Sequence, residues 1–213
     1  MKKLFIAALL AFGFSFSISA QQSKKDVELG LNVGYNRSTI VNSQNTANAG
    51  SGFNFGASAY YYFSNRWSLK GKLIYDQKGW NNDYIRDNAT GILYNTNYKV
   101  NYLTVPVMAN WHFGSKRNWY LNFGPYAGFL LNAKDTRFET DVKKDFNSTD
   151  FGLALGIGVK IPVSDKAKFF VEYEEEGGFS DIFIPNSGSA FRNSRASFNM
   201  GFVFLLDTKL KQK

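Results

Sequence analysis

The sequence has no cysteine and only one histidine among 213 residues. Without cysteine the chain can form no disulfide and has no thiol that could carry a lipid anchor. Acyl transfer and hydrolysis usually need a histidine beside a nucleophile, and metal sites usually need several histidine, cysteine or spaced carboxylate ligands. The lone His112 therefore argues against both kinds of site, and we expect no cofactor and no metal.

Long apolar runs are also missing. After residue 20 no segment approaches 18 unbroken apolar residues, so the sequence predicts no transmembrane helix. Aromatic residues nevertheless make up 17% of the chain, while the mean hydropathy is −0.28. Many aromatics with modest hydropathy are typical of a β-barrel in a membrane, whose strands alternate between lipid-facing and lumen-facing residues.

Residues 1–20 have the three parts of a secretory signal peptide: a basic start, an apolar stretch over residues 4–16, and small residues ending at Ala20. We expect cleavage after Ala20, which would lower the net charge from +8 to +6 by removing Lys2 and Lys3. The alternative is a buried N-terminal helix, but no helical pattern continues past residue 20. The remaining chain divides into a short segment over 21–26, a barrel over 27–206 and a polar tail over 207–213.

Apolar residues alternate with polar or small ones in eight runs, most clearly between Phe151 and Ile161. On a strand this period of two makes one continuous apolar face. The eight runs span residues 27–35, 53–63, 67–78, 98–113, 119–133, 151–161, 168–176 and 196–206. The pattern predicts an all-β protein: an eight-stranded, antiparallel, up-and-down transmembrane β-barrel.

The connections between these runs alternate strictly in length. Short polar connections cover 64–66, 114–118 and 164–167, and the long ones cover 36–52, 79–97, 134–149 and 177–195. Short periplasmic turns and long outer loops are typical of outer-membrane barrels. The sequence therefore predicts four long surface loops on one side and both chain ends on the other.

Large aromatic residues gather beside the short turns and predict an aromatic girdle at one membrane interface. They are Phe63, Trp67, Trp111, Phe113, Trp119, Phe169 and Phe204. A soluble, lipocalin-like barrel is the alternative. Its polar face would have to meet water, whereas the non-apolar face here is rich in glycine and alanine, which suits a narrow lumen holding tyrosine rings. Pro106 and Pro125 lie inside predicted strands, where each removes a ladder hydrogen bond and is compatible with a bulge.

Several charged residues fall on the inward positions of three strands. An eight-stranded barrel has an interior just wide enough for side chains, so opposite charges there can pair and fill it. The predicted lumen charge network consists of Lys70, Lys72, Lys78, Lys160, Glu172 and Glu174. A proton or ion path is the functional alternative, but a filled lumen argues against an open porin.

Five motifs in order along the chain resemble those of the PorT-like outer-membrane β-barrel family. They are LIYDQKG at 73–79, YLTVPV at 102–107, GPY at 124–126, DFGL at 150–153 and GFSDI at 178–182. The resemblance implies an outer-membrane barrel, usually without a known ligand. One member of that family is linked to assembly of a protein-secretion system, but no short motif carries that role to this chain.

The last predicted strand also resembles the insertion signal read by the barrel-assembly machinery. A polar residue, a glycine and two spaced apolar residues make up this signal, here Asn199, Gly201, Phe204 and Leu206. The usual final aromatic is absent, since residues 207–213 follow. An ordinary amphipathic strand is the alternative interpretation.

These observations predict a non-enzymatic integral outer-membrane protein with a plugged polar lumen, which is structural or binds a partner in the cell envelope. The alternatives are an accessory component of a secretion system, a small outer-membrane transporter and a lipid-modifying enzyme. Expected partners are outer-membrane lipid, the barrel-assembly machinery during insertion, and an unidentified surface or periplasmic protein. Nucleic acid is not expected.

Overall fold

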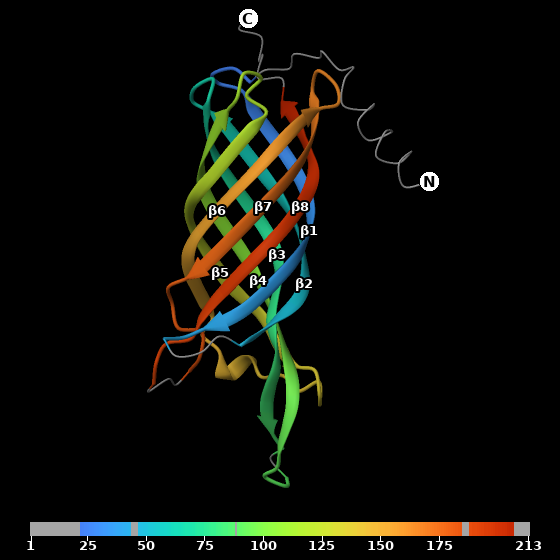
Figure 1. Ribbon diagram of the computed structural model, residues 1–213, viewed down its shortest axis with the longest axis vertical. Helices are drawn as coiled ribbons and strands as arrows, with labels where there is room; N and C mark the ends of the chain where they lie inside the picture. Colours follow the sequence, from blue (N-terminus) through green and yellow to red (C-terminus); the bar gives the residue numbers. More distant parts are fainter. Residues whose placement is uncertain (1–21, 44–46, 88, 185–187, 207–213) are drawn as a thin grey trace, which may run out of the picture.

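The computed structural model describes residues 22–43, 47–87, 89–184 and 188–206. The predicted signal peptide over 1–20 and the predicted tail over 207–213 both lie outside these residues. Eight antiparallel strands follow one another around a closed barrel (Figure 1). They are β1 (Val27–Val41), β2 (Asn48–Tyr62), β3 (Trp67–Arg86), β4 (Leu93–Phe113), β5 (Trp119–Asp135), β6 (Thr149–Pro162), β7 (Ala167–Gly178) and β8 (Arg192–Leu206).

The barrel closes by pairing its first strand with its last. The β1–β8 register runs from Val27 opposite Leu206 to Val41 opposite Arg192. This closure leaves no free sheet edge around the barrel, as a membrane-spanning sheet requires. Among the described residues, no helix is long and apolar enough to cross a membrane.

Side chains alternate between the outside and the inside of the barrel as the sequence pattern predicts. On β1, Leu29, Leu31 and Val33 are exposed, while Glu28 and Asn32 are buried. The glycines on the inner face leave room for large rings, because a Cβ on Gly152 would lie 2.6 Å from the ring of Tyr126. Because the outward positions of the strands are mostly apolar, the outside of the barrel carries a broad apolar belt. A large exposed apolar surface indicates contact with lipid or protein.

Two of the predicted long loops are wrong in extent. Most of 36–52 belongs to β1 and β2, and most of 79–97 belongs to β3 and β4. Outer residues of β3, from Asp83 to Arg86, pair only with β4, and this hairpin projects well past the other strands (Figure 1). The other two long connections are shorter than predicted and run over 136–148 and 179–191. Their described residues are irregular apart from the 3₁₀ turn η1 (Lys143–Asp145) and two isolated bridge pairs.

Neither proline marks a bulge. Pro106 lies opposite Tyr126 and Pro125 opposite Leu153 without a change of register. The register shifts occur instead between Ala49 and Asn54 on β2, between Trp80 and Asp83 on β3, and between Asn101 and Tyr102 on β4. All three lie toward the projecting end, where the strands leave the regular barrel.

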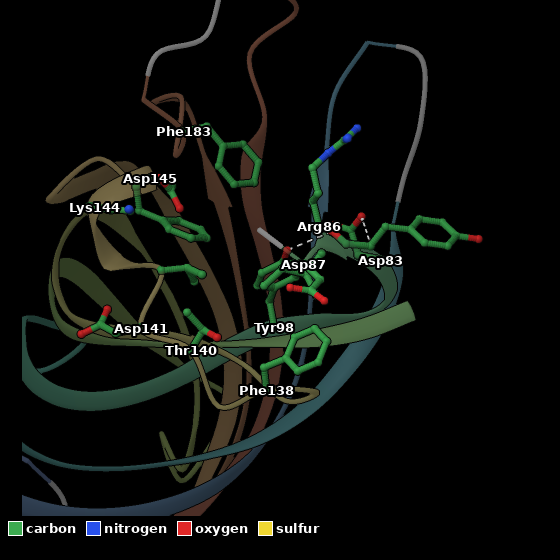
Figure 2. Close-up of a pocket in the computed structure, with 14 residues that line it drawn as sticks. Asp83, Arg86, Asp87, Tyr98, Phe138, Thr140, Asp141, Lys144, Asp145 and Phe183 are labelled. Carbon is green, nitrogen blue, oxygen red and sulfur yellow. Dashed lines mark hydrogen bonds between the residues drawn. The ribbon is translucent and has the colours of Figure 1, made fainter. Parts of the chain in front are cut away.

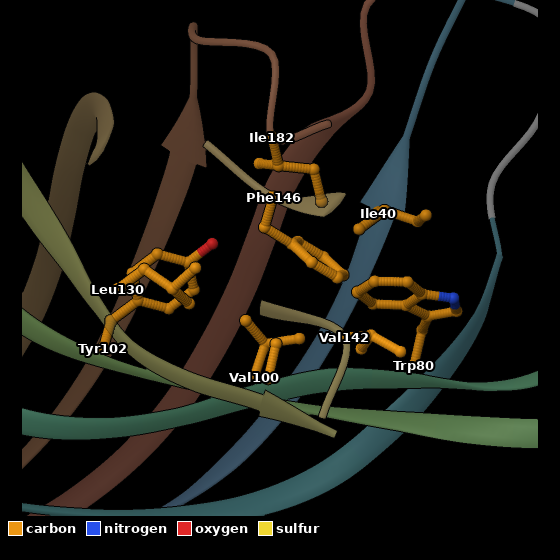
Figure 3. Close-up of a cluster of buried hydrophobic side chains, with 9 residues drawn as sticks. Ile40, Trp80, Val100, Tyr102, Leu130, Val142, Phe146 and Ile182 are labelled. Atoms are coloured by element: carbon orange, nitrogen blue, oxygen red, sulfur yellow. The ribbon is translucent and has the colours of Figure 1, made fainter. Parts of the chain in front are cut away.

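An apolar cluster closes the barrel mouth at that end (Figure 3). Val142 and Phe146, which flank η1, and Ile182 from the β7–β8 connection fold inward onto side chains of the strands. Those strand residues are Ile40, Trp80, Val100, Tyr102, Leu130 and Ala133. We call this cluster the apolar lid. It removes the mouth of the barrel from water and places the charged interior beneath it.

Candidate functional site

Thirteen charged side chains are buried in the part of the chain that the structure describes. One of them, Asp135, lies at the outer end of β5, and the other twelve lie inside the barrel. Six are basic and six are acidic: Lys70, Lys72, Lys78, Lys160, Lys168 and Arg195, with Glu28, Asp76, Asp150, Glu172, Glu174 and Glu176. A charge removed from water needs a partner of opposite sign, and equal numbers allow every member to have one. We call these twelve residues the lumen network.

The predicted members on β3 and β7 are in direct contact. Lys70 Nζ lies 2.5 Å from Glu172 Oε2, while Lys72 Nζ lies 3.4 Å from Glu172 and 2.9 Å from Glu174. Asn122 on β5 also donates to Glu172. The two lysines and two glutamates thus form one alternating chain of charges across the interior.

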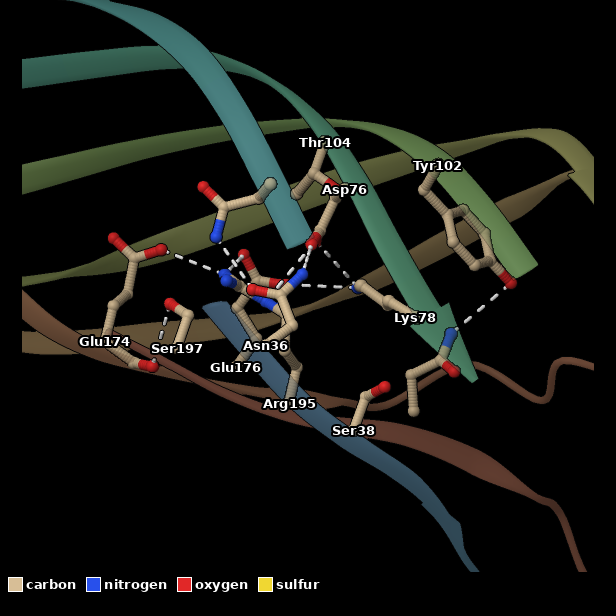
Figure 4. A network of polar contacts seen from close by, with 12 residues as sticks. Asn36, Ser38, Asp76, Lys78, Tyr102, Thr104, Glu174, Glu176, Arg195 and Ser197 are labelled. Atoms are coloured by element: carbon tan, nitrogen blue, oxygen red, sulfur yellow. Dashed lines mark hydrogen bonds and ion pairs between the residues drawn. The ribbon is translucent and has the colours of Figure 1, made fainter. Parts of the chain in front are cut away.

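Arg195 continues this chain toward the apolar lid (Figure 4). Its Nη2 lies 2.9 Å from Glu174 and 2.5 Å from Glu176, and its Nε lies 3.3 Å from Asp76. Lys78 then reaches Glu176 at 3.0 Å and Asp150 at 3.4 Å. A continuous series of ion pairs therefore runs from Lys70 to Asp150.

Lys160 belongs to a separate group near the short turns. Lys160 and Lys168 each place Nζ 2.6 Å from one oxygen of Glu28. The ring of Tyr60 lies between the two groups, 3.8 Å from Lys160 Nζ and 5.4 Å from Lys70 Nζ. Of the six predicted network residues, five therefore belong to the continuous series of ion pairs from Lys70 to Asp150. Lys160 belongs to the separate group around Glu28.

Six members of the network were absent from the predicted set. Asp150 and Arg195 each lie one residue outside the predicted strands, at inward positions of the same alternation. Extending the period of two by one residue would have identified both. The other four lie within or at the ends of predicted strands, and their inward positions in the alternation could have identified them: Glu28, Asp76, Lys168 and Glu176.

His112 is fully buried at the short-turn end. Its Nε2 lies 3.3 Å from the Tyr62 hydroxyl and its Nδ1 lies 3.2 Å from the Arg117 carbonyl oxygen. Tyr62 in turn donates to Glu28. Both ring nitrogens are thus engaged, and among the described residues no group of three histidine, cysteine, aspartate or glutamate side chains could hold a metal ion.

The predicted girdle residues all point outward beside the short turns. Trp111 contacts both Trp67, at a ring separation of 6.2 Å, and Phe113, at 5.3 Å. Phe113 reaches Trp119 at 6.5 Å, so four of the seven rings form one row. Phe169 and Phe204 each contact Phe202 on β8 instead, and Phe63 is exposed next to the β2–β3 turn.

The residues of the predicted insertion signal lie on both faces of β8. Asn199 is buried in the lumen, whereas Phe204 and Leu206 are exposed on the outside. Gly201 lies on the inner side, where a Cβ would lie 2.9 Å from the ring of Phe170. Recognition of these residues by the assembly machinery stays a prediction.

A groove of about 680 Å³ lies outside the barrel, between the projecting β3–β4 hairpin and the η1 segment (Figure 2). Asp83, Ile85 and Asp87 line it from the hairpin, while Asp141 and Asp145 line it from the opposite side. Five aromatic side chains also line the groove: Tyr84, Tyr98, Phe138, Phe146 and Phe183. We call this feature the outer groove; nothing in the sequence pattern had predicted it.

The outer groove lies beyond the apolar belt. Exposed Lys99 and Lys134 face each other directly on β4 and β5 and end the outward apolar run on both strands. Burial and the nearby carboxylates of Asp83, Asp135 and Asp145 raise the pKa of Tyr98, in the groove, to about 12. The lining itself carries four aspartates against two basic side chains, Arg86 and Lys144, so its net charge is negative.

Asp135 fixes the chain that follows β5. Its carboxylate accepts hydrogen bonds from the backbone N–H groups of Arg137, Phe138 and Thr140. Burial alone would raise the pKa of Asp135, but these donors hold the pKa below its ordinary value. The turn carrying Phe138 and Thr140 into the groove is thereby held in place.

Comparison with known proteins agrees with this geometry. Residues 19–184 match the family described as "Outer membrane protein beta-barrel domain". The chain belongs to this family. No curated protein matches the sequence.

Solved structures with the same fold include other outer-membrane barrels at low sequence identity. The crystal structure of OprG from Pseudomonas aeruginosa is 11% identical, with a TM-score of 0.53, and the match covers 88% of this chain and 98% of that one. The solid-state NMR structure of AlkL in lipid bilayers is 9% identical, with a TM-score of 0.54, covering 90% and 94%. At this identity the likeness concerns the fold alone. This member of the outer membrane β-barrel family therefore places its apolar belt in contact with lipid.

Proposed function

We propose that this protein is a closed, non-enzymatic outer-membrane barrel that acts through its outer surface by binding a partner. The observation that carries the proposal is the lumen network. Its twelve charges are paired inside a barrel whose bore is also filled by Tyr60, Tyr62 and Tyr120. Eight strands leave little more than side-chain space.

Closure at the outer mouth supports the same conclusion. The apolar lid covers the lumen network with residues from the β5–β6 and β7–β8 connections. Three of these residues, Val142, Phe146 and Ile182, are buried. Solute entering from that side would have to displace the lid and then break buried ion pairs, each of which is costly to separate. With the interior filled, recognition takes place on the outside, where the described residues form the projecting hairpin and the outer groove.

The engagement of His112 supports the absence of catalysis. A general base needs a free nitrogen within reach of a substrate proton, whereas both nitrogens of this ring contact Tyr62 and the Arg117 backbone. The ring is also buried beneath the short turns, away from the outer groove.

Conductance across a planar bilayer tests the proposal. The purified full-length barrel should show no steady openings, at either polarity and in high salt. Replacement of three lumen-filling rings (Tyr60→Ala, Tyr62→Ala and Tyr120→Ala together) provides a positive control, provided that it folds, because it empties part of the bore. Steady nanosiemens-scale openings in the unaltered protein would show that its lumen is a channel and that the proposal is wrong.

A further inference from the structure

The outer groove differs in charge from the protein that carries it. The whole chain has a net charge of +8, yet the groove lining has four aspartates against two basic residues, Arg86 and Lys144. Arg86 donates to the Gly91 carbonyl oxygen at the hairpin tip, which engages part of its guanidinium group. The groove is thus an acidic site on a basic protein.

Its carboxylates face one another across the groove. Asp83 and Asp87 belong to the hairpin, while Asp141, just before η1, and Asp145, at the end of η1, lie on the other side (Figure 2). Asp83 accepts from the Trp80 indole and the Tyr84 N–H, and Asp87 accepts from Thr90 and the Ala89 N–H. These contacts hold the hairpin carboxylates in place, and none of them is an ion pair that would cancel their charge.

Aromatic rings complete the groove between the two acidic sides. Phe138 is 45% exposed, and Tyr98 and Phe183 also line the cavity. A ring face attracts a lysine or arginine cation, and its apolar surface can cover the methylene stem of the same side chain. Carboxylates and rings together therefore favour a ligand that is both cationic and partly apolar.

We propose that the outer groove binds a basic polypeptide segment of a partner protein, one that alternates lysine or arginine with apolar residues. The inference rests on the proposed function, since it names the chemistry of the partner. A volume of about 680 Å³ lies within the usual range for ligand sites, roughly 300–1,000 Å³. A neutral sugar would use the rings but leave the excess of carboxylates unmatched, so the charge favours the peptide.

Binding of two labelled peptides to the full-length barrel tests this directly. One peptide alternates lysine with tyrosine, and its counterpart alternates glutamate with tyrosine. The protein is held in nanodiscs of zwitterionic lipid, so that the membrane itself does not attract the basic peptide. We expect the lysine peptide to bind, to weaken as salt is raised, and the glutamate peptide not to bind.

Three variants assign the binding to the groove. Asp141→Asn with Asp145→Asn should weaken the lysine peptide by about two- to fivefold per charge removed. Lys144→Gln should strengthen it by a similar factor, a gain that damage to the fold would not produce. Asp165→Asn removes a carboxylate from an exposed short turn at the other end and should change nothing.

The opposite results overturn the inference. Equal binding of both peptides, binding insensitive to all three groove substitutions, or binding of a neutral oligosaccharide in place of the lysine peptide would each do so. A closed barrel that fails to bind the lysine peptide would refute this inference and leave the proposed function standing. A conducting barrel would refute the proposed function whatever the peptides do.

Discussion

At the scale of single residues, burial decides how much a charge matters in this barrel. Glu172 and Glu175 lie three residues apart on β7, but Glu172 is buried between Lys70 and Lys72 whereas Glu175 is exposed on the outer face. Removing one partner of a buried ion pair leaves the other charge without compensation, whereas neutralising Glu175, on the outward face opposite Leu155, leaves no buried charge unpaired. The same chemical change at the two positions should therefore have very different costs.

We predict that Glu172→Gln lowers the free energy of unfolding by about 3–5 kcal/mol, because both lysines lose their shared carboxylate. Glu175→Gln is the matched control and should not lower the free energy of unfolding, because it removes a charge from the outward face opposite Leu155 and leaves no buried charge without a partner. Urea titrations of the protein in lipid vesicles measure both. Equal costs would show that the lumen network does not hold the barrel together.

At the scale of strands, the sequence was informative wherever the period of two was regular. All eight strands, their order and their faces follow from that alternation. The first strand begins at Val27 and the last strand ends at Leu206, as predicted. The pattern fails past Gly79 on β3, where asparagines and a register shift interrupt it. The projecting hairpin was consequently predicted as a loop.

Features that combine several connections could not be predicted from the sequence, for a different reason. The apolar lid joins Val142, Phe146 and Ile182, which lie in irregular segments and have no periodicity to indicate burial. The outer groove likewise combines the β3–β4 hairpin with the η1 segment. These segments come together through tertiary contacts, which local sequence patterns do not encode.

The two faces of β6 allow a sharp test of strand register. Leu155 is 58% exposed on the lipid side, and the adjacent Gly156 faces the lumen. We predict that Leu155→Arg costs about 2–4 kcal/mol if it lies near the bilayer midplane. Gly156→Ser should cost less, because its Cβ would lie 3.0 Å from the Tyr173 carbonyl oxygen and needs only a small shift.

Refolding titrations into bilayers compare these two variants at nearly the same depth. Gly156→Ala is the control, since it adds the Cβ without a hydroxyl. A slip of one residue would exchange the faces of the whole strand, so a larger cost for Gly156→Ser than for both other variants would contradict the register.

At the scale of the whole molecule, the two ends of the barrel differ in kind. One end carries three short turns, while the other carries the projecting hairpin (Figure 1). The apolar lid and the outer groove lie at the hairpin end. Outer-membrane barrels keep their short turns in the periplasm and their longer connections outside. The hairpin and the groove should accordingly face the exterior of the cell, where a partner protein could reach them.

The absence of cysteine makes this orientation directly measurable, because a single introduced thiol is the only one in the chain. Ile92→Cys places it in the exposed hairpin tip, and Asp165→Cys places it in an exposed short turn. We predict that a maleimide too large to cross the outer membrane labels the Ile92 variant on intact cells and leaves the Asp165 variant unlabelled. After the outer membrane is permeabilised, both should react, which shows that the Asp165 thiol was protected by the membrane and not by the fold. Labelling of the Asp165 variant alone on intact cells would mean that the barrel is inserted the other way round, with the outer groove facing the periplasm and any partner located there.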